Sequence, residues 1–379
     1  MQKADSYEKV KKILFVVPRM GGGGAERVIS LLSAEFIKDG KDVTVHTFIG
    51  GESFYNLDSE IKVSDCGIKI SKKPIRRALG MLFKFPKTFF RTRKVIKKGG
   101  YDLVFSFLAT ADIIVWLCKK TGLKFKHVCS ERNDPTHKGK ALIRTLKKVY
   151  KKADMFVCQS EDVKNFYNCV AESKKAVIPN SVNPDIIPAR VKSDEKTVVA
   201  VGRLDGQKNF GLLIDAFSDL GEEFGEYKLN IYGEGKRRAE LEAQIENLGL
   251  SEKVTLCGAK KGLLDIIKTA DLFVMSSDYE GFPNALLEAK AIGLPLVSTD
   301  FKTGTAKEII AADGGTLVPV GDRTALKEAI ERALSSEELR DKESEFNRKD
   351  AEKFYNENVI KKWIFAIDEI IYKKAENGN

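Results

Sequence analysis

The sequence predicts two doubly wound α/β domains in tandem, each built on a parallel sheet with helices on both faces. Three observations lead to this prediction. Short apolar, β-branched runs alternate with helix-length stretches along most of the chain, which is typical of parallel sheets. The chain has 379 residues, and two domains of ~150 to 200 residues each account for that length. A charged stretch with several prolines separates two such series.

The first domain begins with a strand, a glycine loop and a helix. Residues 12–18, KILFVVP, form a short apolar run, and four glycines at 21–24 follow it. The next stretch, AERVISLLSAEFIKDG, repeats its apolar positions at helical spacing. Five further strands of this domain are predicted at residues 43–49, 103–107, 126–129, 155–158 and 176–178.

A linker and a second series of strands follow. Residues 179–184, PNSVNP, precede Pro188 and the charged stretch RVKSDEK, and this composition is that of a linker. The first domain is therefore assigned to residues 1–187 and the second to residues 188–355. Strands of the second domain are predicted at residues 196–202, 228–232, 254–257, 272–275, 295–298 and 316–318.

A helix is expected in the C-terminal segment, residues 356–379. Between residues 358 and 374 the apolar side chains fall on one stripe, so this helix must pack on another part of the protein. The stripe consists of Val359, Trp363, Ile364, Ile367, Ile370 and Ile371. We expect the helix to cross back onto the first domain.

Composition restricts the class of protein. The chain is 43% hydrophobic and 31% charged, as soluble globular proteins are. Its cysteines are scattered without a C-x-x-C pair, which favours a reducing, cytoplasmic compartment over a zinc site or a disulfide framework. The sequence has neither the apolar core of a signal peptide nor a stretch apolar enough to span a membrane. The formal net charge of +10 calls for an anionic partner.

The glycine loop is the first candidate for binding. Ligands of open parallel sheets bind beyond the carboxyl ends of the strands, so two facing domains place their site in the cleft between them. At a helix start, free amides favour an anion, and Gly23 and Gly24 permit close approach of a phosphate. A dinucleotide fingerprint would need Gly or Ala where Glu26 stands. A dehydrogenase site and a plain tight turn are the alternatives for this loop.

The second candidate is the stretch VGRLDGQKN, in which a buried strand leads through Gly202 into a loop before a helix. Arg203 and Lys208 are two cations five residues apart. Arg offers a planar fork for oxyanions, and Lys adds a point charge that can neutralise a departing phosphate without a metal. The pair therefore suits a diphosphate, with a solvated loop as the alternative.

The third candidate follows the strand DLFVM and contains two glutamates, Glu280 and Glu288. Pro283 and Asn284 are residues that start helices, so the free amides of Ala285, Leu286 and Leu287 would face a phosphate. The Glu288 carboxylate suits the two vicinal hydroxyls of a ribose, and Glu280 would lie nearer the transferred group. A solvated helix face is the alternative for two glutamates at this spacing.

These motifs, in this order, resemble those of family 4 of the retaining GT-B glycosyltransferases. The two glutamates match the E-x7-E signature, and GGGGAERV and VGRLDGQKN resemble the family's glycine loop and its G-R-L-x-x-x-K-N element. YGEG at 232–235, VTLCG at 254–258 and LVPVGD at 317–322 resemble further landmarks. SERNDP at 130–135 looks like a segment of bacterial polysaccharide-assembly members.

The resemblance implies a role for each matching residue. Arg203 and Lys208 would hold the donor diphosphate, Glu288 the ribose, and Glu280 with the following backbone the donor sugar. The implied donor-binding set is Gly23, Gly24, Gly202, Arg203, Lys208, Gly258, Gly281, Phe282, Asn284, Ala285, Leu286 and Glu288. Glu280, Arg203 and Lys208 are the implied catalytic residues. Glu26, Glu131, Arg132 and Asn133 are assigned to the acceptor side.

The implied activity is retaining transfer of a hexose or an N-acetylhexosamine from a nucleotide-diphosphate sugar, with UDP as the commonest nucleotide. No cofactor or metal is expected, because no D-x-D pair or carboxylate cluster suits Mg²⁺ and the cations must do the metal's electrostatic work. An epimerase on the same scaffold, which would need additional acid and base groups, and a catalytically silent sugar-nucleotide binding protein are the alternatives.

A basic segment, residues 69–98, suggests where the protein works. Residues 66–101 contain many lysines and arginines but no Asp or Glu. Ile75, Leu79, Leu82, Phe89 and Ile96 fall near one helical face, with a kink expected at Pro86. We expect an interfacial helix that holds a cytoplasmic enzyme on the inner face of the cell membrane, beside a lipid-linked glycan acceptor. An ordinary amphipathic helix is the alternative, and nucleic-acid binding lacks a recognised fold or stacking motif.

Overall fold

A computed structural model describes residues 10–68 and 74–373 of the chain, without the side chains of residues 74–83 and 371–373. The chain divides into two compact units. Unit 1 contains the residues up to Asn180 and those from Val359 onward, and unit 2 is Ser181–Asn358. Each unit is built on its own parallel sheet, which confirms the predicted fold class.

Unit 1 holds a seven-stranded sheet with the strand order β3-β2-β1-β4-β5-β6-β7. Its strands are β1 (Lys12–Val17), β2 (Asp42–Thr47), β3 (Lys62–Asp65), β4 (Leu103–Phe107), β5 (Lys126–Ser130), β6 (Met155–Cys158) and β7 (Lys175–Val177). All of these strands run parallel. The carboxyl ends of β1, β4 and β5 therefore lie at one edge of the sheet. The glycine loop follows β1, and the SERNDP segment begins at the end of β5.

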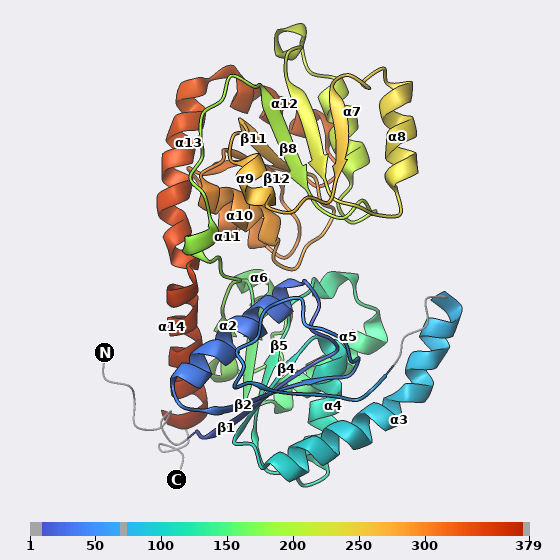
Figure 1. Cartoon of the computed structure of the whole chain (residues 1–379), viewed down its shortest axis with the longest axis vertical. Helices are drawn as coiled ribbons and strands as arrows, with labels where there is room; N and C mark the ends of the chain where they lie inside the picture. The colour runs from blue at the N-terminus through green and yellow to red at the C-terminus, as the bar shows by residue number, and fades with distance from the viewer. Residues whose placement is uncertain (1–9, 69–73, 374–379) are drawn as a thin grey trace. The chain divides into compact units, whose positions relative to one another are not determined.

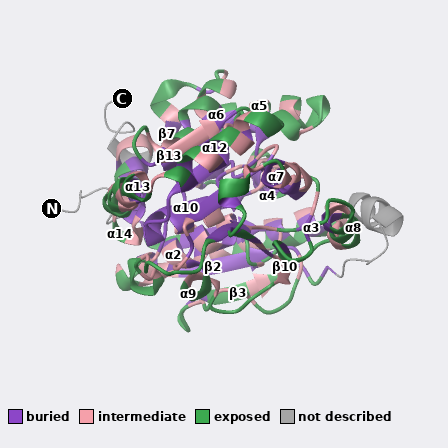
Figure 2. Cartoon of the chain, turned by 90° about the horizontal axis from the view of Figure 1, so that it is seen from above, coloured by how far each residue is buried: buried purple, intermediate pink, exposed green. Residues whose placement is uncertain are grey.

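The edge strand β3 was not predicted from the sequence. Its four residues, KVSD, are exposed or half-exposed, so they lack the apolar run by which the other strands were recognised. Figure 2 shows the contrast between β3 and the buried strand β2. Pairing with β2 alone forms this strand, and a short polar edge strand leaves no periodic signal in a sequence.

Helices cover both faces of the unit 1 sheet (Figure 1). The helices α2 (Gly24–Lys38) and α14 (Asn356–Ile367) pack on one face, against Phe15, Phe105 and Phe107. The other face carries α3 (Pro74–Gly99), α4 (Ala109–Lys120), α5 (Lys140–Lys152) and α6 (Glu161–Phe166). Alternation of side chains along each strand creates the two separate cores.

The C-terminal helix packs on unit 1, as predicted. Trp363 of α14 is fully buried, with its ring 6.1 Å from that of Phe105 and 6.4 Å from that of Phe107. Val359 and Ile367 join the same core. After α14 the chain continues as a π-helix, Asp368–Lys373. The chain therefore leaves unit 1 after β7 and returns to it in its last helix.

Unit 2 holds a six-stranded parallel sheet with the order β10-β9-β8-β11-β12-β13. Its strands are β8 (Thr197–Val201), β9 (Lys228–Tyr232), β10 (Val254–Gly258), β11 (Leu272–Met275), β12 (Leu296–Thr299) and β13 (Gly315–Val318). Its helices are α7 (Phe210–Ser218), α8 (Arg238–Asn247), α9 (Leu263–Ile267), α10 (Asn284–Ile292), α11 (Thr305–Ile310), α12 (Arg323–Ser335) and α13 (Glu337–Asp350). The central strands β8 and β11 are neighbours, which brings the loops that follow them together.

The division between the units lies seven residues before the boundary expected at residue 187. The amide of Val182 donates to the carbonyl of Phe354 (2.9 Å), and the amide of Asn356 donates to the carbonyl of Val182 (3.0 Å). Val182 is also fully buried in a unit 2 core. These long-range contacts draw the segment after Asn180 into unit 2, whereas a boundary placed by prolines responds only to local composition.

The basic segment forms most of α3, with Pro86 inside the helix. Lys69, Lys72 and Lys73 lie outside the described residues, as do the side chains of Ile75, Arg76, Arg77, Leu79 and Leu82. In the described half, Ile96 is buried and Phe89 half-buried against the unit 1 core, so this part of the apolar stripe is covered by protein. None of the helices within residues 10–68 and 74–373 is long and apolar enough to cross a membrane.

Candidate functional site

The loop after β8 is shaped by glycines that allow backbones to approach closely. A Cβ on Gly202 would lie 2.7 Å from Cε of Lys208, so this glycine makes room for the lysine side chain. A Cβ on Gly233 would lie 1.8 Å from the carbonyl oxygen of Gly202, and one on Gly235 would lie 2.2 Å from that of Leu204. The YGEG segment therefore supports the loop that carries Arg203 and Lys208.

Lys208 and Glu280 form the centre of the unit 2 site. The Lys208 ammonium lies 2.6 Å from Oε1 of Glu280, and both side chains are about nine-tenths buried, at 13% and 10% exposure. The hydroxyl of Ser277 donates to the same oxygen (2.9 Å), and Nε2 of Gln207 donates to Oε2 (3.0 Å). Three donors hold the carboxylate, so its charge is compensated and its orientation is set before any ligand binds.

Gln207 links this centre to Arg203. Its Nε2 also donates to the carbonyl of Tyr279 (2.9 Å), and its Oε1 accepts from Nη2 of Arg203 (3.4 Å). The Arg203 side chain is 73% exposed and lies 3.5 Å from Asp205. Because Lys208 is paired with Glu280, Arg203 is the cation of the pair whose donors remain accessible to a diphosphate.

The two loops are tied together by further bonds. Asn209, at φ 45° in the left-handed region, donates from Nδ2 to Asp278 (2.7 Å) and accepts the amide of Leu212 at the start of α7 (3.4 Å). The hydroxyl of Ser276 donates to the carbonyl of Lys208 (2.9 Å), and that of Thr303 to the carbonyl of Glu280 (3.0 Å). The loops after β8 and β11 are therefore one preorganised assembly.

The first turn of α10 provides backbone donors. Pro283 precedes the helix, and no side chain caps its amides. The amide of Leu287, predicted as a free donor, instead bonds to the carbonyl of Pro283 (3.1 Å), because the helical bonding pattern already begins there. The amides of Ala285 and Leu286 belong to the first turn, which has no i−4 partner inside the helix.

The remaining predicted residues of unit 2 lie around this turn. Phe282 is buried, with its ring 6.1 Å from that of Phe354, so it anchors the loop through its packing. Gly281 and Glu288 are half-buried. Gly258, at φ 74°, ends β10, and a Cβ there would lie 3.0 Å from the Glu234 carboxylate. Gly258 therefore packs closely against the YGEG segment.

In unit 1 the glycine loop opens α2, as predicted, but a carboxylate already lies against it. Oε2 of Glu26 would be 2.5 Å from a Cβ built on Gly23, and Glu26 is 7% exposed. The carbonyl of Gly23 accepts the Tyr55 hydroxyl (3.2 Å) and the amide of Arg27 (3.1 Å). A phosphate approaching Gly23 and Gly24 would meet this negative charge, whereas a hydroxyl would find an acceptor.

Glu131 is placed for support rather than for contact with a ligand. Its side chain is fully buried, and its Oε2 lies 2.6 Å from Nζ of Lys138. The same oxygen accepts the hydroxyls of Tyr150 (3.2 Å) and Tyr167 (3.1 Å), while Oε1 accepts the amides of Arg132 (3.1 Å) and Asn133 (3.2 Å). The carboxylate therefore fixes the SERNDP turn from inside.

Arg132 and Asn133 take different places in that turn. The guanidinium of Arg132 lies 5.4 Å from the centre of the Trp363 ring, and it donates to Ser130 (2.8 Å) and Asn180 (3.2 Å). Burial lowers the pKa of Arg132 to about 9, and its Nη2 has no hydrogen-bond partner among the described residues. Asn133 is exposed, so it is the member of the turn whose side chain meets solvent.

Histidine, cysteine and carboxyl side chains that serve as acids, bases or nucleophiles in other enzymes lie here in the core of unit 1. His46 and His127 are buried, and burial lowers their pKa values to about 4 and about 3. Burial raises the pKa of the Cys129 thiol and of the Asp112 carboxyl. Across the part of the chain that the structure describes, no three His, Cys, Asp or Glu side chains gather as metal ligands would.

Sequence reasoning missed Gln207, Ser277 and Thr303, which orient Glu280. Gln207 is the neighbour of Lys208 in the stretch VGRLDGQKN, and Ser277 is three residues before Glu280. Their positions close to recognised charged residues could have identified them. Thr303 follows β12, and only the folded chain brings it to Glu280. Charge and glycine patterns identify groups that bind ligands, but neutral residues that position them carry no such pattern.

Two family models together match most of the chain. The model described as Glycosyl transferases group 1 matches residues 183–350, and the model described as Glycosyltransferase Family 4 matches residues 22–186. The two matches correspond closely to unit 2 and to the larger part of unit 1.

Curated relatives match over nearly the whole length. A GalNAc-alpha-(1->4)-GalNAc-alpha-(1->3)-diNAcBac-PP-undecaprenol alpha-1,4-N-acetyl-D-galactosaminyltransferase of Campylobacter jejuni is 30% identical, over 95% of this chain and 99% of the relative. An N-acetylgalactosamine-N,N'-diacetylbacillosaminyl-diphospho-undecaprenol 4-alpha-N-acetylgalactosaminyltransferase of the same organism is 29% identical, over 87% and 92%.

Solved structures share the fold. The apo form of the lipopolysaccharide outer core galactosyltransferase WaaB aligns with a TM-score of 0.76 and 22% identity, over 94% of this chain and 99% of that one. Anabaena Alr3699/HepE in complex with UDP aligns with a TM-score of 0.76 and 18% identity, over 94% and 99%.

Proposed function

Because this chain belongs to family 4 of the GT-B glycosyltransferases, we propose that it transfers a hexose or an N-acetylhexosamine from a UDP-sugar to a lipid-linked glycan. Transfer would retain the anomeric configuration and need no metal. One observation carries this proposal: Arg203, Gln207, Lys208 and Glu280 form a continuous bonded series at the carboxyl ends of β8 and β11, where parallel sheets bind their ligands.

The donor diphosphate would bind between Arg203 and the first turn of α10. Arg203 supplies a fork of accessible donors, and the amides of Ala285 and Leu286 supply backbone donors at the positive end of the helix. Glu288, one turn further along α10, would accept the two ribose hydroxyls. The UDP complexes of the HepE fold relative support UDP as the nucleotide.

In the reaction, the bond between the anomeric carbon and the diphosphate oxygen breaks and its electron pair goes to the leaving diphosphate. Arg203 stabilises that charge through its accessible donors, and Lys208 offsets the nearby charge of Glu280 so that the carboxylate does not repel the leaving diphosphate. The acceptor oxygen then bonds to the anomeric carbon from the same face, and its proton passes to the departing phosphate oxygen. Glu280, held by three donors, accepts hydrogen bonds from the donor sugar and is not the nucleophile.

The acceptor side would be formed by unit 1. Asn133 reaches solvent from a turn that Glu131 holds in place, and Glu26 offers an acceptor for a sugar hydroxyl next to Gly23. Both Campylobacter relatives act, by their names, on undecaprenol-linked glycans, which supports a lipid-linked acceptor for this chain. The exposed cations of α3 would hold the enzyme on an anionic cytoplasmic membrane surface.

The test is calorimetric binding of UDP in the presence of a chelator. We expect micromolar binding to the wild type and a loss of at least tenfold in Arg203→Ala, because a charge-assisted bond to a phosphate is worth roughly 1.5 to 3 kcal/mol. Arg348→Ala is the matched control, since Arg348 is an exposed arginine on α13 of the same unit, and it should bind UDP as the wild type does.

Other outcomes would redirect the proposal. Equal UDP affinity in the wild type and Arg203→Ala would remove the assigned diphosphate site. Binding that requires Mg²⁺ would contradict metal independence. UDP binding without transfer from any UDP-sugar to polyprenyl-diphosphate-linked glycans would favour a silent sugar-nucleotide binding protein.

A further inference from the structure

Three of the four helices on one face of the unit 1 sheet, α3, α4 and α5, form a continuous layer. The fourth, the short α6, packs beside α5 and carries the exposed Glu161 and Asp162. Leu14, Val16 and Val104 point to this face and pack under α3 and α4, while Cys129 and Phe156 pack under α4 and α5. The helix α4 contacts both α3 and α5, so it lies between them (Figure 1). The helices α2 and α14 lie on the opposite face of the sheet.

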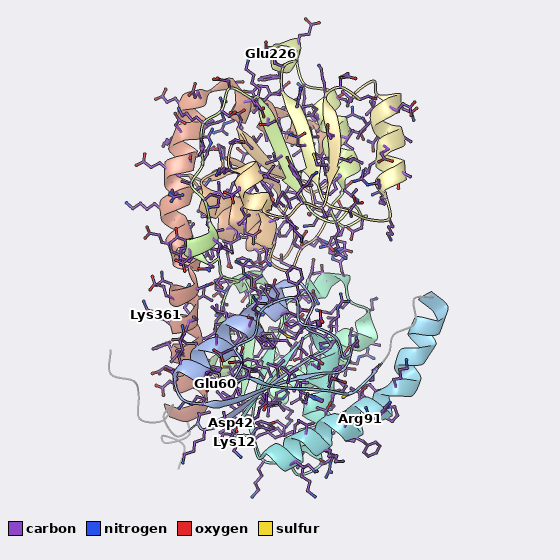
Figure 3. All side chains as sticks on the ribbon, in the orientation of Figure 1. Lys12, Asp42, Glu60, Arg91, Glu226 and Lys361 are labelled. Atoms are coloured by element: carbon purple, nitrogen blue, oxygen red, sulfur yellow. The ribbon has the colours of Figure 1, made fainter. Side chains whose placement is uncertain are left out.

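The outer surface of this layer carries charge of one sign. The exposed cations of α3 are Lys87, Arg91, Lys94, Lys97 and Lys98, and Figure 3 labels Arg91. The exposed cations of α5 are Lys140, Arg144, Lys148, Lys151 and Lys152. Asp112 is the one acidic residue in α4, α5 and the described side chains of α3, and it is fully buried. The layer is therefore electropositive without compensation by its own helices.

Apolar side chains also reach solvent within this basic surface. Phe90 of α3 is 66% exposed, and Leu142 of α5 is 37% exposed. Trp116 of α4 is half-buried, with the ammonium of Lys120 4.6 Å from the centre of its ring. Apolar and aromatic groups among cations are typical of surfaces that enter the headgroup region of a bilayer.

We propose that the whole layer α3–α4–α5 is a docking surface for an anionic lipid bilayer, with α5 contributing as much as α3. The segment 69–98 is then one edge of the surface and α5 is the other. Two basic edges on either side of α4 would hold unit 1 in one orientation on the membrane, whereas a single helix leaves rotation about its axis open. This inference rests on the proposed function for the presence of a membrane-bound acceptor.

The bilayer accounts for these features better than a nucleic acid does. Each cation near an anionic surface contributes roughly 1 kcal/mol to binding, and the exposed phenylalanine and leucine gain from the acyl boundary. Single-stranded nucleic acids need a positively charged groove with stacking platforms, whereas the cations here lie on the outer sides of helices.

The test measures co-sedimentation of the full chain with vesicles of phosphatidylglycerol and phosphatidylcholine, compared with phosphatidylcholine alone. We expect Lys148→Ala/Lys151→Ala on α5 to reduce the affinity for anionic vesicles about thirtyfold, and Lys94→Ala/Lys98→Ala on α3 to reduce it by a similar factor. Lys342→Ala/Lys349→Ala removes two exposed lysines from α13 of unit 2 and should leave the affinity within about twofold of the wild type. Alanine preserves the helices, and UDP binding should be unchanged in all three variants.

Each outcome distinguishes this inference from the proposed function. If only the α3 variant loses affinity, the role of α5 is refuted and the transferase proposal stands. If the wild type does not bind anionic vesicles, or binds an RNA duplex more tightly than it binds them, the docking surface is refuted. UDP binding remains the independent test of the donor site. Equal losses in the α5 and α13 variants would also overturn the inference, because they would show an effect of total charge.

Discussion

At the scale of single residues, the proposed donor site depends on a neutral side chain as much as on its charged ones. Gln207 donates to Glu280 and to the carbonyl of Tyr279 and accepts from Arg203. It thereby fixes the side chains of Arg203 and Glu280 relative to each other. Lys208 neutralises Glu280, so the site is preorganised without surplus negative charge facing the leaving diphosphate.

This arrangement predicts graded effects of substitution at Gln207. Gln207→Ala removes a bond to a carboxylate, which is worth roughly 1.5 to 3 kcal/mol, and should lower kcat by tenfold or more with a smaller change in KM for the UDP-sugar. Gln207→Glu places a second carboxylate at the position of Nε2, 3.0 Å from Glu280, and should be worse. Steady-state turnover measures both, and a variant Gln207→Glu as active as the wild type would refute the positioning role.

At the scale of elements, α13 buries a carboxyl group that has little compensation. Glu343 is 7% exposed, and its Oε2 has no hydrogen-bond partner in the described part of the chain. Burial raises the pKa of Glu343 from 4.5 to about 7, against a smaller lowering effect of Arg332. The folded state therefore keeps a proton that the unfolded state releases.

Stability should consequently fall as the pH rises through this window. Below about pH 4.5 the carboxyl is protonated in both states, and above about pH 7 the folded state bears a penalty on the order of 3 kcal/mol. Glu343→Gln should be more stable than the wild type at pH 8 and nearly equal to it at pH 5, as urea unfolding measures. Glu345→Gln, an exposed site on the same helix, is the control and should show no such difference.

At the scale of the whole molecule, the chain completes unit 1 only with its last helix. Trp363 fills the core between α14 and the strands β4 and β5, and it also underlies Arg132. The helix α14 is therefore part of the unit 1 core, although more than 170 residues, Ser181–Asn358, separate it from the rest of that unit.

Loss of this anchor should destabilise unit 1. Trp363→Ala should cost roughly 3 to 5 kcal/mol, as other large-to-small changes in cores do. Phe365→Ala, two residues along on the same helix and 61% exposed in the wild type, should change stability by about 0.5 kcal/mol or less. Chemical denaturation compares the two variants, and equal stability would show that α14 is dispensable for the core.

The sequence by itself determined the class of fold and twelve of the described strands within a residue or two, and it singled out the charged residues of the proposed donor site. Periodic apolar runs, glycines and paired charges are local signals, and they survive in a sequence because each reflects a local physical requirement. The packing of the C-terminal helix was also predictable, since an apolar stripe at helical spacing must be covered.

Only the tertiary structure decided how these residues are used. It placed Glu131 in the core, folded Glu26 against Gly23, paired Lys208 with Glu280 and covered part of the apolar stripe of α3. It also added β3 and set the division between the units at Asn180. Each of these outcomes depends on contacts between segments far apart in the chain, and neither composition nor spacing encodes whether a charged side chain meets water, a ligand or a partner within the protein.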